Sequence, residues 1–153
     1  MNCLVSDMLA IADEKYLQMV ELLKLTEEQT TCLAEEDVEK LERYVGCRQS
    51  IIDRINSLDA RYGELKAQLM KGNNADGLEA LKGEIDVQKI IDLNVKTKSI
   101  IRKTIEIDKK NAEMGKQLLE KLGEALAQAN KAPAAHRAYH SNLSGAIFIN
   151  RQG

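Results

Sequence analysis

Only two histidines occur in the sequence, His136 and His140, and they are the first residues to test for metal or catalytic chemistry. Their spacing of four residues would place both imidazoles on one face of a helix, where they could share a metal ion. Two ligands do not complete a metal site, and no cysteine or carboxylate lies close to them in the sequence. A small enzyme or metal protein built on this pair is therefore the weaker alternative, and we expect no metal ion or other cofactor.

Cysteines and carboxylates give no stronger indication of catalysis. Cys3, Cys32 and Cys47 are widely spaced, odd in number and without a C-x-x-C pair, which favours reduced thiols packed as small apolar residues. The many carboxylates include no E-x-x-H pattern of the kind that di-iron sites in helical bundles use, and no G-K-[ST] follows any glycine. Since no acid, base and nucleophile come together, we predict a protein that is not an enzyme.

One basic cluster could contact phosphate groups or an acidic protein surface. It carries no interleaved aromatic residues, and two acidic residues interrupt it, so a solvated helix face that pairs with acidic helices is the better interpretation. The formal net charge of −2 also gives no field that would attract nucleic acid or anionic lipid. We therefore expect no nucleic-acid partner. The cluster consists of Lys96, Lys98, Arg102, Lys103, Lys109 and Lys110.

The elements that must position these residues are helices. Charged residues make up 30% of the 153 residues and aromatic residues 3%, there is one proline, and Ala, Leu, Glu and Lys recur throughout. The sequence predicts an all-α protein, an elongated antiparallel bundle or coiled coil of three helices. No apolar run is long enough to span a membrane, and charges interrupt the N-terminal region, so we expect a cytoplasmic protein without membrane insertion.

Two helices and a tight turn are predicted for the first half of the chain. An amphipathic helix over about 2–33 is followed by an acidic turn near 34–37 and a second helix over about 38–71. The apolar stripe of the second helix changes phase once near Ile55, and Arg48 falls on that stripe. We expect Arg48 to lie at the edge of the bundle, with its stem packed and its guanidinium in water.

The third helix is predicted to be the longest. Residues 72–77 form the clearest loop, and Asp76 with Glu79 resembles a capping box before a helical segment that Gly83 could interrupt. From Ile91 to Ala129 apolar residues return every three or four positions, apart from two seven-residue steps centred on Asp108 and Gly115. We call this row of apolar residues the apolar seam of the third helix. A helix of ~45 residues would exceed the second helix in length by about 20 Å at 1.5 Å per residue, so the second helix cannot cover the whole seam and part of it needs another partner.

That seam could bind a foreign amphipathic helix or a second copy of the chain, and the sequence favours neither. We divide the chain into a helical bundle domain over residues 1–130 and a flexible tail over 131–153, with an apolar segment near its end. The residues that we expect to bind a partner are Ile105, Leu119, Leu122 and Leu126 on the third helix and Tyr139, Ile147 and Phe148 in the tail.

Three stretches resemble one family, the bacterial flagellar export chaperones of the FlgN type and their relatives that serve the filament cap. The first looks like the family's acidic turn into its second helix, the second like an Ile-x-x-Asp-x-x-Asn segment of the third helix, and the third like a tail with a tyrosine, a glycine, an aromatic residue and a basic end. The first stretch comprises Cys32 to Leu41 with Arg48, Gln49 and Ile52. The second is Ile105 to Asn111, and the third is Tyr139 with Gly145 to Arg151.

The resemblance implies a cytosolic chaperone for flagellar type III export. Its clients would be hook–filament junction (hook-associated) proteins, bound through their C-terminal helical segments and delivered to the export gate. A disordered client segment could fold onto an apolar groove with an affinity that the gate can reverse. The alternative is a structural coiled-coil adaptor that self-associates as a homodimer or a tetramer and has no flagellar client.

Overall fold

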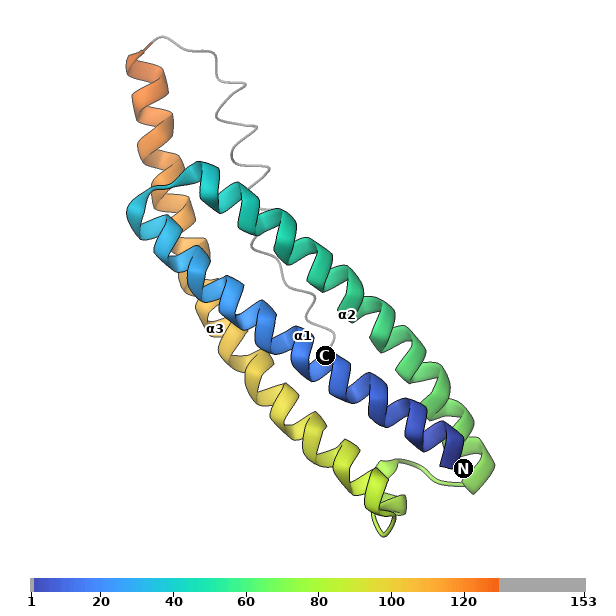
Figure 1. The fold of residues 1–153 in the computed structure, drawn as a ribbon. Coiled ribbons are helices and arrows are strands. Elements are labelled where there is room, and N and C mark those ends of the chain that lie inside the picture. The colour runs from blue at the N-terminus through green and yellow to red at the C-terminus, as the bar shows by residue number, and fades with distance from the viewer. Residues whose placement is uncertain (1, 130–153) are drawn as a thin grey trace. The chain divides into compact units, whose positions relative to one another are not determined.

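Three long helices dominate the computed structural model, which describes residues 2–129 (Figure 1). Helix α1 spans Asn2–Glu35, α2 spans Val38–Asn73 and α3 spans Ile85–Gln128, and a short 3-10 helix, η1, spans Leu78–Leu81. The predicted all-helical class is confirmed, and α3 is the longest helix with 44 residues against 36 in α2. None of these helices is long and apolar enough to cross a membrane, as judged over the described residues.

The connection between α1 and α2 occupies the predicted acidic turn. The backbone N–H of Asp37 donates to the carbonyl of Cys32 at 2.9 Å, and that of Glu36 donates to Leu33 at 3.2 Å, so α1 ends in a Schellman motif. Glu36 takes the left-handed position of the motif with φ of 57°. The Asp37 carboxylate then accepts from the backbone N–H of Lys40 at 3.1 Å and caps α2.

The connection between α2 and α3 is longer and contains η1. Asn74 adopts φ of 49°, and the N–H of Ala75 donates to the carbonyl of Met70, so α2 also ends in a Schellman motif. The predicted capping box of Asp76 and Glu79 is wrong: η1 is preceded by Gly77 and has no side-chain cap. The interruption considered at Gly83 is present, because α3 begins only at Ile85.

Each long helix carries a column of core residues spaced seven apart, which is the repeat of coiled-coil packing. The column in α2 passes through Arg48 as a core position, and the phase change near Ile55 is seen beside it: buried Ile52 lies four residues after Arg48, whereas buried Leu58 lies three residues after Ile55. Polar residues also belong to the columns of α1 and α3, so the spacing of the apolar residues alone indicates only part of each column. The columns are Val5, Ala12, Met19, Thr26 and Leu33 in α1; Leu41, Arg48, Ile55, Tyr62 and Leu69 in α2; and Ile90, Thr97, Thr104, Asn111 and Leu118 in α3.

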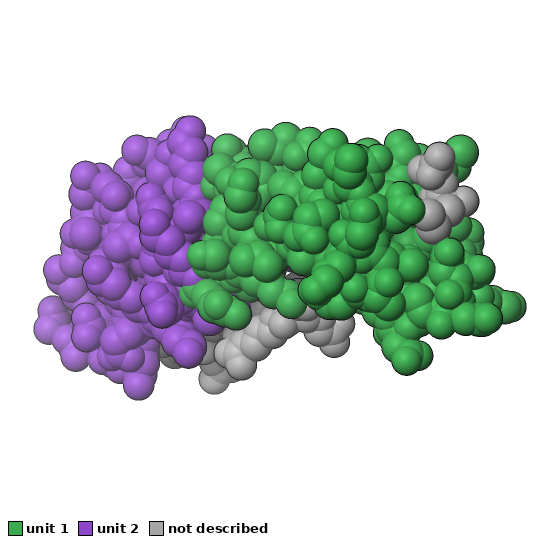
Figure 2. Space-filling view, turned by 90° about the horizontal axis from the view of Figure 1, so that it is seen from below, with its two compact units in different colours: residues 1–21, 53–102 green, residues 22–52, 103–153 purple. Residues whose placement is uncertain are grey.

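The chain divides into two compact units (Figure 2). Each unit contains a segment of every long helix, and each segment runs antiparallel to the next one along the chain (Figure 1). Unit 1 comprises residues 1–21 and 53–102. Its core is apolar, and Leu78 of η1 is buried in it. The buried members of this core are Val5, Met8, Ala12, Leu65, Leu69, Leu78, Val87 and Ile90.

Unit 2 comprises residues 22–52 and, in the described part of the chain, 103–129. Its apolar cluster lies next to the connection between α1 and α2 and contains Cys32, Leu33, Leu41, Leu118 and Leu119. Buried polar residues from all three helices, together with the buried Leu22, Leu25 and Ile52, form the rest of its interior. The predicted boundary between bundle and tail, at residues 130 and 131, lies outside the described residues.

Candidate functional site

The predicted partner-binding residues of α3 all lie in unit 2, but they differ in exposure. Leu119 is buried, with 7% of its surface exposed, and packs in the cluster of Cys32, Leu33 and Leu41. Leu122 is half-buried and packs against the same cluster. Ile105 and Leu126 are half-buried. The seven-residue spacing from Ile105 through Ala112 and Leu119 to Leu126 places these side chains along one side of α3, beside the core column.

The other residues singled out in the sequence lie outside the described residues. Tyr139, Ile147 and Phe148 belong to this group, and so do His136 and His140. Among the residues that the structure describes, no group of three or more His, Cys, Asp or Glu side chains could hold a metal ion.

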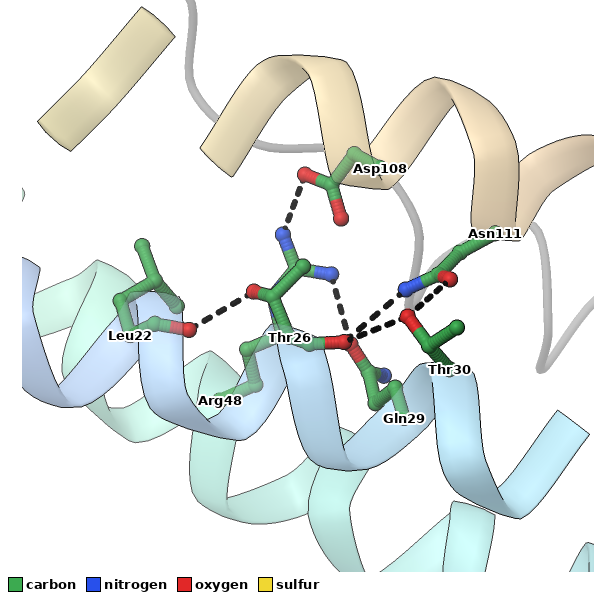
Figure 3. Close-up of polar contacts among 7 residues, drawn as sticks. All are labelled: Leu22, Thr26, Gln29, Thr30, Arg48, Asp108 and Asn111. Atoms are coloured by element: carbon green, nitrogen blue, oxygen red, sulfur yellow. Dashed lines mark hydrogen bonds and ion pairs between the residues drawn. The ribbon is translucent and has the colours of Figure 1, made fainter. Parts of the chain in front are cut away.

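The feature of unit 2 that the sequence did not reveal is a buried ion pair between α2 and α3 (Figure 3). Arg48 is 1% exposed, so the expectation that its guanidinium lies in water at the edge of the bundle is wrong. One of its terminal nitrogens, Nη2, donates to Oδ2 of Asp108 at 2.6 Å, and the other, Nη1, donates to Oε1 of Gln29 at 3.0 Å. Arg48 of α2 therefore bonds α1 and α3 at the same level of unit 2.

A second set of hydrogen bonds, one buried and one partly buried, joins α1 directly to α3, one helical turn from the ion pair. The side-chain amide of Asn111 donates to the backbone carbonyl of Thr26 at 3.0 Å and accepts from the hydroxyl of Thr30 at 2.6 Å. The hydroxyl of Thr26 donates to the carbonyl of Leu22 within α1. We call Thr26, Gln29, Thr30, Arg48, Asp108 and Asn111 the polar layer of unit 2.

The carboxyl group of Asp108 is the titratable centre of the polar layer. Burial raises its pKa to about 6, while the charge of Arg48 and the hydrogen bond from it act in the lowering direction. Its Oδ1 atom has no hydrogen-bond partner among the described residues. The layer contains no nucleophile with an adjacent base, so the arrangement can bind helices together but has no parts for covalent chemistry.

Two signals in the sequence point to this layer in retrospect. Asp108 and Gly115 occupy the middles of the two long steps in the apolar seam of α3, and both are buried core positions. Arg48 falls on the apolar stripe of α2. A carboxylate and a guanidinium that each replace an apolar residue in facing seams are candidates for a buried pair, since either charge alone would be costly to bury.

The remaining candidates agree in part with the sequence analysis. The six residues of the basic cluster are exposed, and none of them forms an ion pair with another described residue. The three cysteines are free thiols. Cys32 is buried as expected, and burial raises its pKa, but Cys3 and Cys47 are exposed rather than packed.

Comparison with known proteins identifies one family. A family model described as FlgN protein matches residues 1–143, which is most of the chain. No curated protein and no solved structure matches the sequence. The matched range includes all three long helices and the polar layer. The chain therefore belongs to the FlgN family, the flagellar export chaperones for hook-associated proteins, which is a family of chaperones and not of enzymes.

Proposed function

We propose that this chain acts in the cytoplasm as a flagellar type III export chaperone that binds the C-terminal helical segments of hook–filament junction proteins and delivers them to the export gate. The observation that supports this proposal most directly is the family match over residues 1–143. The half-buried apolar side of α3 supports it further, because apolar surface that a bundle does not fully cover is suited to an amphipathic helix.

The proposed contact residues are Ile105, Leu119, Leu122 and Leu126, joined by Tyr139, Ile147 and Phe148. The two leucines near the end of α3 are the best to test, because they are half-buried and polar replacements there disturb the core least. Leu119 is less suitable, since it is buried in the cluster of unit 2 and its substitution would also destabilise the fold.

The experiment is co-purification, followed by calorimetric titration, of the full-length protein with the C-terminal segment of a hook–filament junction protein. We expect the wild type to bind and the double variant Leu122→Gln/Leu126→Gln to bind at least about tenfold more weakly. The control is Leu17→Gln, which makes the same replacement at a leucine on α1 that is 60% exposed. It should bind like the wild type.

Two results would contradict the proposal. If the wild type does not bind the segment, the chaperone function for this class of client is wrong. If the chain instead forms a stable dimer that Leu122→Gln/Leu126→Gln dissociates, without client binding, the self-associating adaptor is the better description. Sedimentation equilibrium of both proteins distinguishes these cases.

A further inference from the structure

The two units differ in what they bury. In unit 1 the buried side chains are apolar apart from Thr97, whereas in unit 2 polar side chains make up nearly half of those buried, over the described residues. The buried apolar residues of unit 1 are Val5, Met8, Ala12, Met19, Ile55, Leu58, Leu65, Leu69, Leu78, Val87 and Ile90. Those of unit 2 are Leu22, Leu25, Cys32, Leu33, Leu41, Ile52, Leu118 and Leu119, together with the polar Thr26, Gln29, Arg48, Thr104, Asp108 and Asn111.

This difference affects the free energy that holds the helix segments of each unit together. Apolar side chains gain free energy in proportion to the area that they remove from water, so every buried leucine of unit 1 resists opening. Buried polar groups exchange bonds with water for bonds within the protein, and their net gain is small. A buried ion pair can even be less favourable than apolar side chains of similar volume. Packing of the helix segments therefore gains less free energy for each buried side chain in unit 2 than in unit 1.

The geometry of the polar layer shows where opening would begin. Movement of the α3 segment of unit 2 away from α1 and α2 breaks the Arg48–Asp108 ion pair and the bonds of Asn111 to Thr26 and Thr30. Water can satisfy each of these groups as soon as they separate. Oδ1 of Asp108, which has no partner among the described residues in the closed state, gains hydration on opening.

We propose that the polar layer makes unit 2 a conformational gate: residues 103–128 of α3 open locally from α1 and α2 at the level of Arg48 and Asp108, while unit 1 stays closed. Opening exposes the buried Leu119 and the half-buried Ile105 at the same time, and these offer an apolar surface to an incoming helix. The identity of that helix as a client segment rests on the proposed function, but the opening itself does not.

Native-state hydrogen exchange of the full-length protein without client tests the opening. We expect the amides of residues 104–118 to exchange at least about tenfold faster than those of residues 87–101, although both stretches lie within the same helix. The double variant Arg48→Met/Asp108→Leu replaces the ion pair by apolar side chains. It should slow exchange over residues 104–118 about tenfold or more and leave residues 87–101 unchanged.

A matched pair of single variants keeps the test valid if the double variant does not fold. Thr26→Val and Thr97→Val make the same change at buried column positions of unit 2 and unit 1, respectively. Thr26→Val should slow exchange over residues 104–118 and not over 87–101. Thr97→Val should not slow exchange in unit 2. Equal protection of the two stretches in the wild type would overturn the proposal, and so would an effect of Thr26→Val that spreads equally over both units.

Binding of the client segment provides the second measurement. If the gate admits the client, Arg48→Met/Asp108→Leu should bind more weakly by about the factor by which exchange slows. Unchanged affinity together with slowed exchange would overturn the role of the gate in binding. If the wild type shows fast exchange in unit 2 but does not bind the segment, the opening is retained and the proposed function fails, so the two failures are distinguishable.

Discussion

Folding changes the titration of the Asp108 carboxyl group. Its pKa is raised to about 6 in the folded protein, above the value of about 3.9 for an unfolded chain. The folded state therefore binds more protons than the unfolded state between about pH 4 and pH 6. The stability that this proton confers is fully present below about pH 4 and is lost as the pH rises through about 6.

The first prediction concerns the removal of this titration. Asp108→Asn keeps the shape of the side chain without its charge, so the variant lacks this titration. The wild type loses stability as the Asp108 carboxyl group ionises, and the variant does not. The free energy of unfolding of the variant should therefore rise relative to that of the wild type between pH 4 and pH 7, by on the order of 3 kcal/mol at most. Urea denaturation at a series of pH values measures this difference. A difference that falls as the pH rises would mean that attraction to Arg48 outweighs desolvation.

Arg48 illustrates what the sequence could and could not reveal about single residues. Its position on the apolar stripe of α2 was visible, but an arginine there can either extend to water along the surface or enter the core. The choice depends on Asp108, which lies 60 positions away and reaches Arg48 only through the packing of α2 against α3. The local sequence around Arg48 holds no information on that partner.

At the scale of the helices, most boundaries follow from local signals. The acidic stretch before Val38 and the Asn-Gly-rich stretch after Lys71 predicted the ends of α1 and α2 to within about two residues, because turns need residues with these backbone preferences. The short helix η1 was not predicted as a separate element. Its four residues show no periodicity of their own, and it depends on the burial of Leu78 in the core of unit 1.

The second prediction concerns the end of α1. Glu36 holds a left-handed backbone conformation that costs an L-residue free energy and that glycine adopts readily. Glu36→Gly should therefore raise the free energy of unfolding by about 0.5–1 kcal/mol. Loss of the Lys121–Glu36 ion pair should matter little, since both side chains are exposed. Chemical denaturation measures the effect.

Two controls separate the backbone from the charge in this experiment. Lys121→Ala removes the same ion pair and leaves the backbone of Glu36 unchanged, so it should have little effect on stability. Asn74→Gly makes the equivalent change at the end of α2, where asparagine already tolerates the left-handed conformation, and should stabilise less than Glu36→Gly. A destabilised Glu36→Gly variant would contradict the assignment of strain at this position.

At the scale of the whole molecule, stability depends on core positions that belong to the seven-residue columns. Leu69 is fully buried in unit 1 and is the last member of the column in α2. The third prediction is that Leu69→Ala lowers the free energy of unfolding by about 2–5 kcal/mol. Leu17→Ala on α1, where 60% of the side chain is exposed, should change it by less than about 0.5 kcal/mol. Urea denaturation of both variants tests the pair, and similar small losses would contradict the assigned core.

The fold class, the three helices and the family could all be predicted from composition, periodicity and the resemblance. The division of the interior into an apolar part and a polar part could not. Thr26, Thr104 and Asn111 are common on solvated helix faces, and only their seven-residue spacing relative to Leu33 and Leu118 places them in the core columns. The seven-residue repeat is visible in the sequence only when these polar residues are counted as core positions.

The connection at Asp37 constrains how the chain can be extended or labelled. This one residue completes the end of α1 through its backbone N–H and caps α2 through its carboxylate. An inserted residue here would break one of these bonds and, at about 100° per residue, would turn the remainder of α2 so that Arg48 no longer faces Gln29. Length variation, epitope tags and fluorophores therefore belong on either side of η1, near Asp76 or Lys82, because Leu78 of η1 is buried in the core of unit 1. There Asp76, Glu79 and Lys82 are exposed, and no helix of the bundle has to keep its phase across the insertion.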